Sequence, residues 1–179
     1  MSVKFLSNSI KYIFLSFIIV SFSLITLSWI NAPNGVNCMP YFSFNVIGER
    51  YKIMYEMSAA YKILGFLLTL AYSSFSFTIY WMLYKLFDAF SKEEFFSLKV
   101  IILIKRVGFL YLIKELVAPF YEALFSFFAT YQNPKGHGIL TVSFDPQNLE
   151  NILLGLILFV AARIMSEGFK LKQGSQLTV

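Results

Sequence analysis

The sequence predicts an all-α membrane protein: a four-helix transmembrane bundle with both termini in the cytoplasm and two short strands in the outer loops. The first observation is the composition, because 58% of the 179 residues are hydrophobic and only 14% are charged, whereas a soluble domain carries about 25% charged residues. The second is that the apolar residues gather in four long segments. The third is that the basic residues are concentrated on one side of these segments.

Four membrane spans are expected within a single integral membrane domain, residues 1–179. The first is an uncleaved signal anchor, because its apolar run is too long for a signal peptide and Ile30 is too large for the cleavage site. The first three segments reach the length of about 20 residues that crossing requires. The fourth is short, so Glu150 and Arg163 must lie near the two interfaces. The expected spans are residues 12–30, 61–84, 107–129 and 149–165.

The distribution of Lys and Arg predicts the orientation. It places both termini and the inner loop, residues 85–106, in the cytoplasm, with outer loops at residues 31–60 and 130–148. We therefore expect a multi-pass protein of the cell inner (plasma) membrane, whose net charge of +5 reflects topology and not direct nucleic-acid binding. The inner group comprises Lys4, Lys11, Lys85, Lys92, Lys99, Lys105, Arg106, Arg163, Lys170 and Lys172, and the outer group Arg50, Lys52, Lys62 and Lys135.

The two outer loops contain segments that alternate between apolar and polar residues. In "YFSFNV", residues 41–46, Phe42, Phe44 and Val46 fall on one side and Tyr41, Ser43 and Asn45 on the other. In "ILTVSF", residues 139–144, Leu140, Val142 and Phe144 lie opposite Thr141 and Ser143. Alternation of this kind is typical of strands. We expect two short strands that rest on the outer ends of the helices and that either cap the bundle or form a ligand-sensing lid.

The third expected span contains ionisable residues that a lipid-facing helix would not tolerate. Lys114, Glu115 and Glu122 all lie in its middle part. Glu115 and Glu122 are seven residues apart and therefore share a helix face. Pro119 has no N–H, so it frees the carbonyl of Glu115 and favours a kink. These groups must face the bundle interior or a wet cavity.

Partners for the two glutamates are expected on the second span. If the second and third spans are antiparallel, Ser76 lies level with Glu115, and Thr69 lies level with Glu122. These residues and Lys114 form a predicted intramembrane polar site. One interpretation is hydrogen bonding between helices that fixes their packing. The other is a proton or ion path, or a polar ligand pocket.

Two short motifs resemble those of an uncharacterised bacterial four-span family, domain-of-unknown-function family 2975. The inner-loop stretch "FFSLKVIILIKRVG", residues 95–108, fits the family's pattern of an aromatic residue, a hydroxyl residue and a basic pair before Gly. The chain departs from the pattern at Lys99 and Val100 and, before this stretch, at Ser91. The C-terminus fits the family's Leu-Thr-Val ending. The resemblance implies four helices with both termini inside, no known reaction, and genes beside a helix-turn-helix regulator. The matching residues are Phe96, Ser97, Ile104, Lys105, Arg106, Val107, Gly108, Gly168, Leu171, Leu177, Thr178 and Val179.

The sequence does not predict an enzyme, a cofactor or a metal site, because His137 is the only histidine and no nucleotide- or metal-binding spacing appears. The leading hypothesis is a non-enzymatic membrane regulator or scaffold for a cytoplasmic transcriptional regulator. The alternative is a small transporter or proton-coupled channel that uses Glu115 and Glu122. The lipid bilayer is the expected surrounding, and self-association is left open. Candidates for inner-face docking are Lys105, Arg106, Leu177, Thr178 and Val179.

Overall fold

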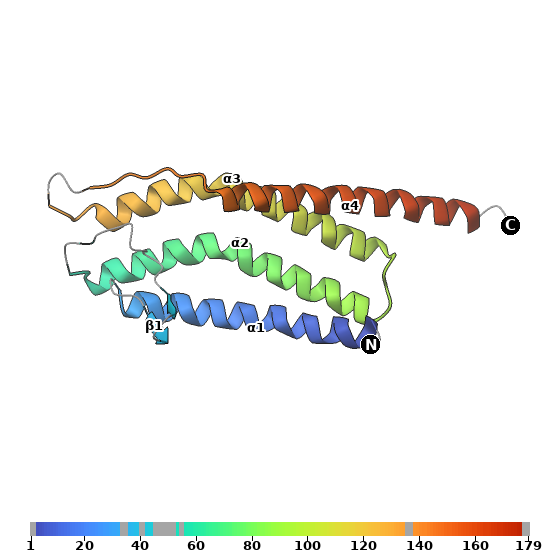
Figure 1. The fold of residues 1–179 in the computed structure, drawn as a ribbon, viewed down its shortest axis with the longest axis horizontal. Coiled ribbons are helices and arrows are strands. Elements are labelled where there is room, and N and C mark those ends of the chain that lie inside the picture. The colour runs from blue at the N-terminus through green and yellow to red at the C-terminus, as the bar shows by residue number, and fades with distance from the viewer. Residues whose placement is uncertain are drawn as a thin grey trace. The chain divides into compact units, whose positions relative to one another are not determined.

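Four helices account for most of the chain in the computed structural model, which describes residues 3–32, 36–39, 42–44, 53, 56–134 and 138–176. Each helix contains its predicted span and is longer than that span, most of all the fourth. The helices are α1 (Val3–Ile30), α2 (Ala59–Ser91), α3 (Leu98–Thr130) and α4 (Pro146–Gln176) (Figure 1).

The expected inner loop, residues 85–106, is mostly helical. Helix α2 continues to Ser91, and α3 already begins at Leu98. The connection turns at Glu93, whose φ of 64° lies in the left-handed region. Ser97 begins α3 as its N-cap, because its hydroxyl oxygen accepts a hydrogen bond from the Val100 N–H at 3.3 Å.

Only one of the two expected strands is present. Strand β2 (Phe42–Phe44) lies within the segment predicted as extended, but it pairs antiparallel with β1 (Val36–Met39), a neighbour in the same loop. The other predicted strand, residues 139–144, has no regular secondary structure. Its backbone bonds to side chains of a helix and not to a second strand, as described below.

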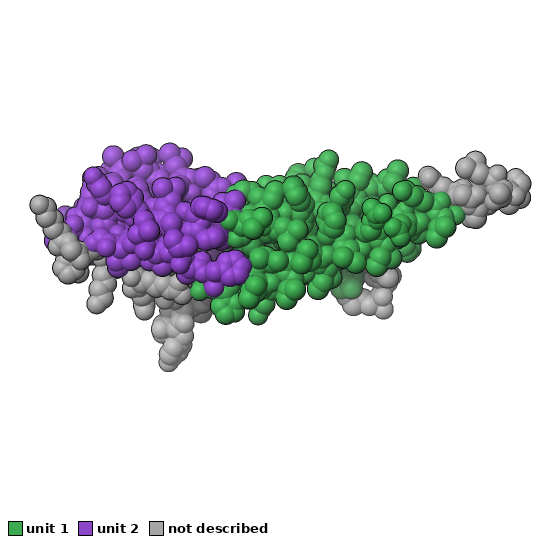
Figure 2. All heavy atoms as spheres, turned by 90° about the horizontal axis from the view of Figure 1, so that it is seen from above, with its two compact units in different colours: residues 1–18, 75–116, 145–179 green, residues 19–74, 117–144 purple. Residues whose placement is uncertain are grey.

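The chain divides into two compact units. Unit 1 comprises residues 1–18, 75–116 and 145–179, and unit 2 comprises residues 19–74 and 117–144; they are coloured green and purple in Figure 2. Helices α1, α2 and α3 each contribute one part to each unit, whereas α4 belongs to unit 1.

The core of unit 1 joins α2, α3 and α4 through small and branched side chains. Ala89 and Ala162 are almost completely buried and allow the helices to approach closely. The backbones of α3 and α4 approach closely at Gly108 and Gly155, because a Cβ added at Gly108 would lie 2.7 Å from the Gly155 carbonyl oxygen. The buried core residues are Leu86, Ala89, Val100, Leu103, Ile104 and Ala162.

The core of unit 2 is aromatic. The indole of Trp29 lies over Gly65, where a Cβ would meet its ring at 2.0 Å, so that only glycine fits at this position. Trp29 Nε1 donates a hydrogen bond to Thr69 Oγ1 at 3.1 Å. Tyr61 stacks on Phe128 with ring centres 4.3 Å apart. These contacts join the unit 2 parts of α1, α2 and α3.

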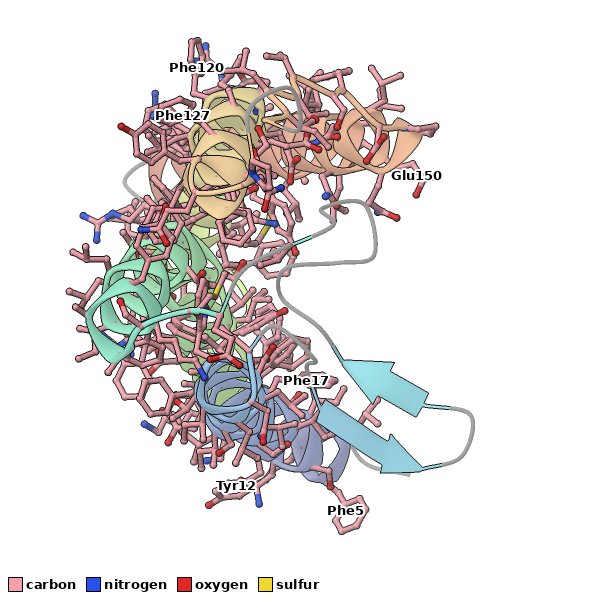
Figure 3. All side chains as sticks on the ribbon, turned by 90° about the vertical axis from the view of Figure 1, so that its left-hand side faces the viewer. Phe5, Tyr12, Phe17, Phe120, Phe127 and Glu150 are labelled. Atoms are coloured by element: carbon pink, nitrogen blue, oxygen red, sulfur yellow. The ribbon has the colours of Figure 1, made fainter. Side chains whose placement is uncertain are left out.

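Among the described residues, three helices are long and apolar enough to cross a membrane: α1, α2 and α4. Helix α4, which appeared shortest from the sequence, is one of them, whereas α3 is not, because charged residues interrupt it. Many large apolar side chains are exposed, and Phe120 and Phe127 of α3 point away from the neighbouring helices in Figure 3. Exposure of so much apolar surface is expected of a membrane protein.

Candidate functional site

One face of α3 carries a row of polar side chains. Glu122, Ser126 and Thr130 follow one another at intervals of four residues, and Glu115 precedes Glu122 by seven. Residues at these intervals share a helix face. All four side chains make hydrogen bonds, Glu115 within unit 1 and the other three within unit 2.

In unit 2 the row binds the backbone of an extended segment. The Ile139 N–H donates to Thr130 Oγ1 at 2.9 Å. The Thr141 N–H donates to Ser126 Oγ at 2.9 Å. At the end of the row, Glu122 Oε2 accepts hydrogen bonds from the N–H of Ser143, at 3.2 Å, and from its hydroxyl. We call Thr130, Ser126 and Glu122, with the segment of residues 139–143, the α3 ladder.

The α3 ladder works because two spacings nearly coincide. Four residues of an α-helix rise about 6 Å, and two residues of extended chain cover about 6.6 Å. Every second N–H of the segment therefore meets the next side chain of the row. The other residues, Leu140, Val142 and Phe144, are exposed. The predicted alternation is thus present, but the polar side faces a helix.

In unit 1 the carboxylate of Glu115 is surrounded by donors and is only 2% exposed. Its Oε2 accepts from Asn148 Nδ2 at 2.6 Å. Its Oε1 accepts from Asn151 Nδ2 at 2.9 Å and from Lys114 Nζ at 3.4 Å. Both asparagines belong to the first turns of α4, where the helix dipole also favours a negative group. We call these four residues the Glu115 cluster.

Asn148 also stabilises the start of α4 through two hydrogen bonds with Asp145. Its Oδ1 accepts a hydrogen bond from the Asp145 N–H at 2.8 Å, and its own N–H donates to the Asp145 carbonyl oxygen at 2.9 Å. Asn148 therefore both stabilises the turn that leads into α4 and donates a hydrogen bond to Glu115.

The hydrogen-bond partners of Glu115 differ from those that the sequence predicted. Glu115 bonds to Lys114 and to α4, and Ser76 of α2 is not among its hydrogen-bond partners in the described part of the chain. The Thr69 hydroxyl accepts from Trp29 and donates to the Gly65 carbonyl oxygen at 2.9 Å. Depth along a helix did not predict which neighbouring helix Glu115 meets.

Asn148 and Asn151 were missed by sequence reasoning. The available signal is modest: Pro146 begins a helix, and the two asparagines that follow are three residues apart on one face. An asparagine pair at the start of an apolar helix is equally typical of capping, so the pattern alone does not point to Glu115.

At the other end of unit 1, three charged side chains join α1 to the α2–α3 connection. Asp88 accepts from Lys11 Nζ at 2.9 Å and from Lys92 Nζ at 2.7 Å. The hydrogen bond with Asp88 raises the pKa of Lys92 above its ordinary value. This triad holds the start of α1 against the end of α2.

The predicted docking residues are only partly described. Lys105 and Arg106 lie on α3 with exposed side chains. Leu177, Thr178 and Val179 lie outside the described residues, as does His137. Within the part of the chain that the structure describes, no three His, Cys, Asp or Glu side chains are grouped so that they could hold a metal ion.

Comparison with known proteins gives a family but no activity. A family model described as a protein of unknown function (DUF2975) matches residues 46–179, which include both sequence motifs. No curated protein and no solved structure matches the chain.

Proposed function

This chain belongs to the DUF2975 family, and we propose that it is a non-enzymatic, multi-pass protein of the cell inner membrane that regulates or scaffolds a cytoplasmic partner. In this proposal all four helices span the membrane, and both termini and the α2–α3 connection lie in the cytoplasm. The length and composition of α1, α2 and α4 support embedding in a membrane. The excess of Lys and Arg at one end supports the orientation.

One observation carries the partner-binding part of the proposal, namely the length of α4. The helix continues to Gln176, whereas Met165 is the last residue of α4 among the described hydrophobic side chains that pack against the unit 1 core. In Figure 1 the final turns of α4 extend beyond the connection between α2 and α3. Leu171, near this end, is 77% exposed. An apolar side chain on a helix that projects from its bundle suits a groove on another protein.

The resemblance suggests the type of partner, a helix-turn-helix DNA-binding regulator encoded nearby. A regulator held by α4 would be kept at the membrane and away from DNA. The basic pair Lys105 and Arg106 would add electrostatic attraction to an acidic partner surface. The tail of residues 177–179 would extend the contact.

Capture in detergent tests this function. The full-length protein is expected to capture one DNA-binding protein from a lysate of its own host, identified by mass spectrometry. Truncation after Lys172, Leu171→Ser, or reversal of Lys105 and Arg106 to Glu should abolish capture. Leu140→Ser is the matched control, because Leu140 is similarly exposed but lies in the α3 ladder segment. Undiminished capture by correctly inserted Leu171→Ser and truncated proteins would overturn the docking role of α4.

The alternative function, a small transporter or proton-coupled channel, rests on Glu115 and Glu122. Both carboxylates accept hydrogen bonds from neighbouring groups of the chain, which supports a packing role. Solute or proton flux in proteoliposomes that disappears in a stable Glu115 variant would favour transport instead.

A further inference from the structure

A small cavity of about 130 Å³ opens between α3 and α4 in unit 1, and we call it the α3–α4 cavity. Its walls are apolar, because Ile101 and Ala162 are buried there and Phe159 lies at the edge. Its rim carries two cations and a hydroxyl. The lining residues are Ile101, Lys105, Phe159, Ala162, Arg163 and Ser166.

Both cations are positioned by neighbours at the cavity. The ammonium of Lys105 lies 5.7 Å from the centre of the Phe159 ring, a cation–π contact that links α3 to α4. Arg163 Nε donates to Glu167 Oε1 at 3.0 Å, which engages one of the five N–H donors of the guanidinium. Glu167 therefore offsets part of the positive charge at the rim.

The cavity lies where the apolar part of α4 ends. No charged residue occurs between Glu150 and Arg163, so in a membrane-spanning α4 the Arg163 side chain would lie at the boundary between hydrocarbon and headgroups. Leu156, Phe159 and Arg163 share one face of α4, because they are three and four residues apart. On α3, the exposed side chain of Phe109 lies one turn beyond Lys105, toward the apolar part of the helix. Each cation thus stands at the end of an apolar strip that is open to lipid.

We propose that the α3–α4 cavity binds the phosphate group of an anionic phospholipid, with Lys105, Arg163 and Ser166 as its ligands and the lipid chains along Leu156 and Phe109. A water molecule occupies about 30 Å³ in the liquid, so a cavity of about 130 Å³ holds a group the size of a few waters. That is room for a phosphodiester group but not for a whole lipid. Guanidinium and ammonium groups are the usual partners of phosphate. Basic pockets between membrane helices at the headgroup level bind anionic lipids.

Native mass spectrometry of the full-length protein in detergent tests the site. Phosphatidylglycerol should bind at one molecule per chain and roughly tenfold more tightly than phosphatidylcholine with the same acyl chains. Lys105→Gln and Arg163→Gln should each lower this affinity by roughly tenfold, whereas Glu167→Gln should raise it by releasing Arg163. Lys99→Gln is the control, because it removes an equal charge from an exposed residue of α3 outside the cavity lining.

Equal affinity for both lipids would overturn the proposal, as would a loss of affinity in the Lys99→Gln control equal to that in the cavity variants. Displacement of the lipid by millimolar inorganic phosphate would also overturn it, because that result would identify a free anion as the occupant. The substituted side chains are exposed, so the variants are expected to fold, and their thermal midpoints verify this. The proposal rests on membrane embedding but not on the cytoplasmic partner. Truncation after Lys172 tests that partner and leaves every cavity residue in place.

Discussion

At the scale of single residues, the Glu115 cluster is defined by the direction of its hydrogen bonds. Three N–H donors, from Lys114, Asn148 and Asn151, converge on the two oxygens of one carboxylate. An amide in place of that carboxylate has one acceptor oxygen and one donor group. The cluster therefore distinguishes glutamate from glutamine, although the two are equal in size.

Glu115→Gln is expected to destabilise the protein by about 1–3 kcal/mol, because its amide N–H₂ would face the donor group of an asparagine in a buried site. Asn148→Asp should lower the free energy of unfolding further, since it places two carboxylates in contact. In the double variant, the new amide on α3 can donate to the new carboxylate on α4, which still accepts from the Asp145 N–H, so the combined loss should be smaller than the sum. Thermal unfolding in detergent measures all three. Strictly additive losses would contradict the contact between these residues.

The burial of Glu115 was predictable from the sequence, because a carboxylate in an apolar membrane helix must be buried and paired. Its partners were not. The position of Ser76 depended on α2 facing this side of α3, whereas the start of α4 occupies it. One-dimensional spacing gives depth along a helix, but the choice between two neighbouring helices depends on packing elsewhere.

At the scale of elements, α4 depends on a narrow contact with α3. Most of its large apolar residues between Leu149 and Ile164 are exposed, and Gly155 and Ala162 are its buried positions. A Cβ at Gly155 would lie 2.9 Å from the Gly108 carbonyl oxygen, and backbone cannot move aside as a flexible side chain can. Besides this contact, Leu158 and Ala162 pack the apolar part of α4 against the unit 1 core.

Gly108→Ala and Gly155→Ala should therefore each separate α3 from α4 and lower the free energy of unfolding by about 1–3 kcal/mol. Gly168→Ala is the matched control within α4. A Cβ there would meet no atom within 4 Å, so alanine should be neutral or stabilise the helix by up to about 1 kcal/mol. Thermal midpoints in detergent compare the three. An unchanged midpoint for Gly108→Ala would contradict the close approach of the two backbones.

The elements also show what periodicity can and cannot predict. A period of two in residues 139–144 correctly separated the exposed apolar side from the polar side. It could not predict the α3 ladder, because a strand ladder and a row of helix side chains both satisfy alternate N–H groups. The helices were predictable from long apolar runs, but the length of α4 was not, since its final turns are polar.

At the scale of the whole molecule, the topology turns on whether α3 crosses the membrane. Its charges argue against this by composition, since an isolated charge in a membrane helix costs about 2.5–3.5 kcal/mol. The structure reduces that cost in two places. Glu115 is buried among donors, and Glu122 accepts from the N–H and hydroxyl of Ser143. Within the expected span, residues 107–129, the exposed side chains of α3 are apolar, and Phe120 and Phe127 are among them (Figure 3). Both observations favour a spanning α3.

Labelling of single cysteines in cells tests this topology, with Cys38→Ser as the background. Glu56→Cys precedes α2, Glu94→Cys lies in the α2–α3 connection, and Gln132→Cys follows α3; all three positions are exposed. If α3 spans, a membrane-impermeant maleimide should label positions 56 and 132 in intact cells and position 94 only after permeabilisation. If α3 does not span, position 132 should behave like position 94, because no membrane crossing separates them. That pattern would make α3 a surface or re-entrant helix, and it would place the α3 ladder on the same side as the basic residues.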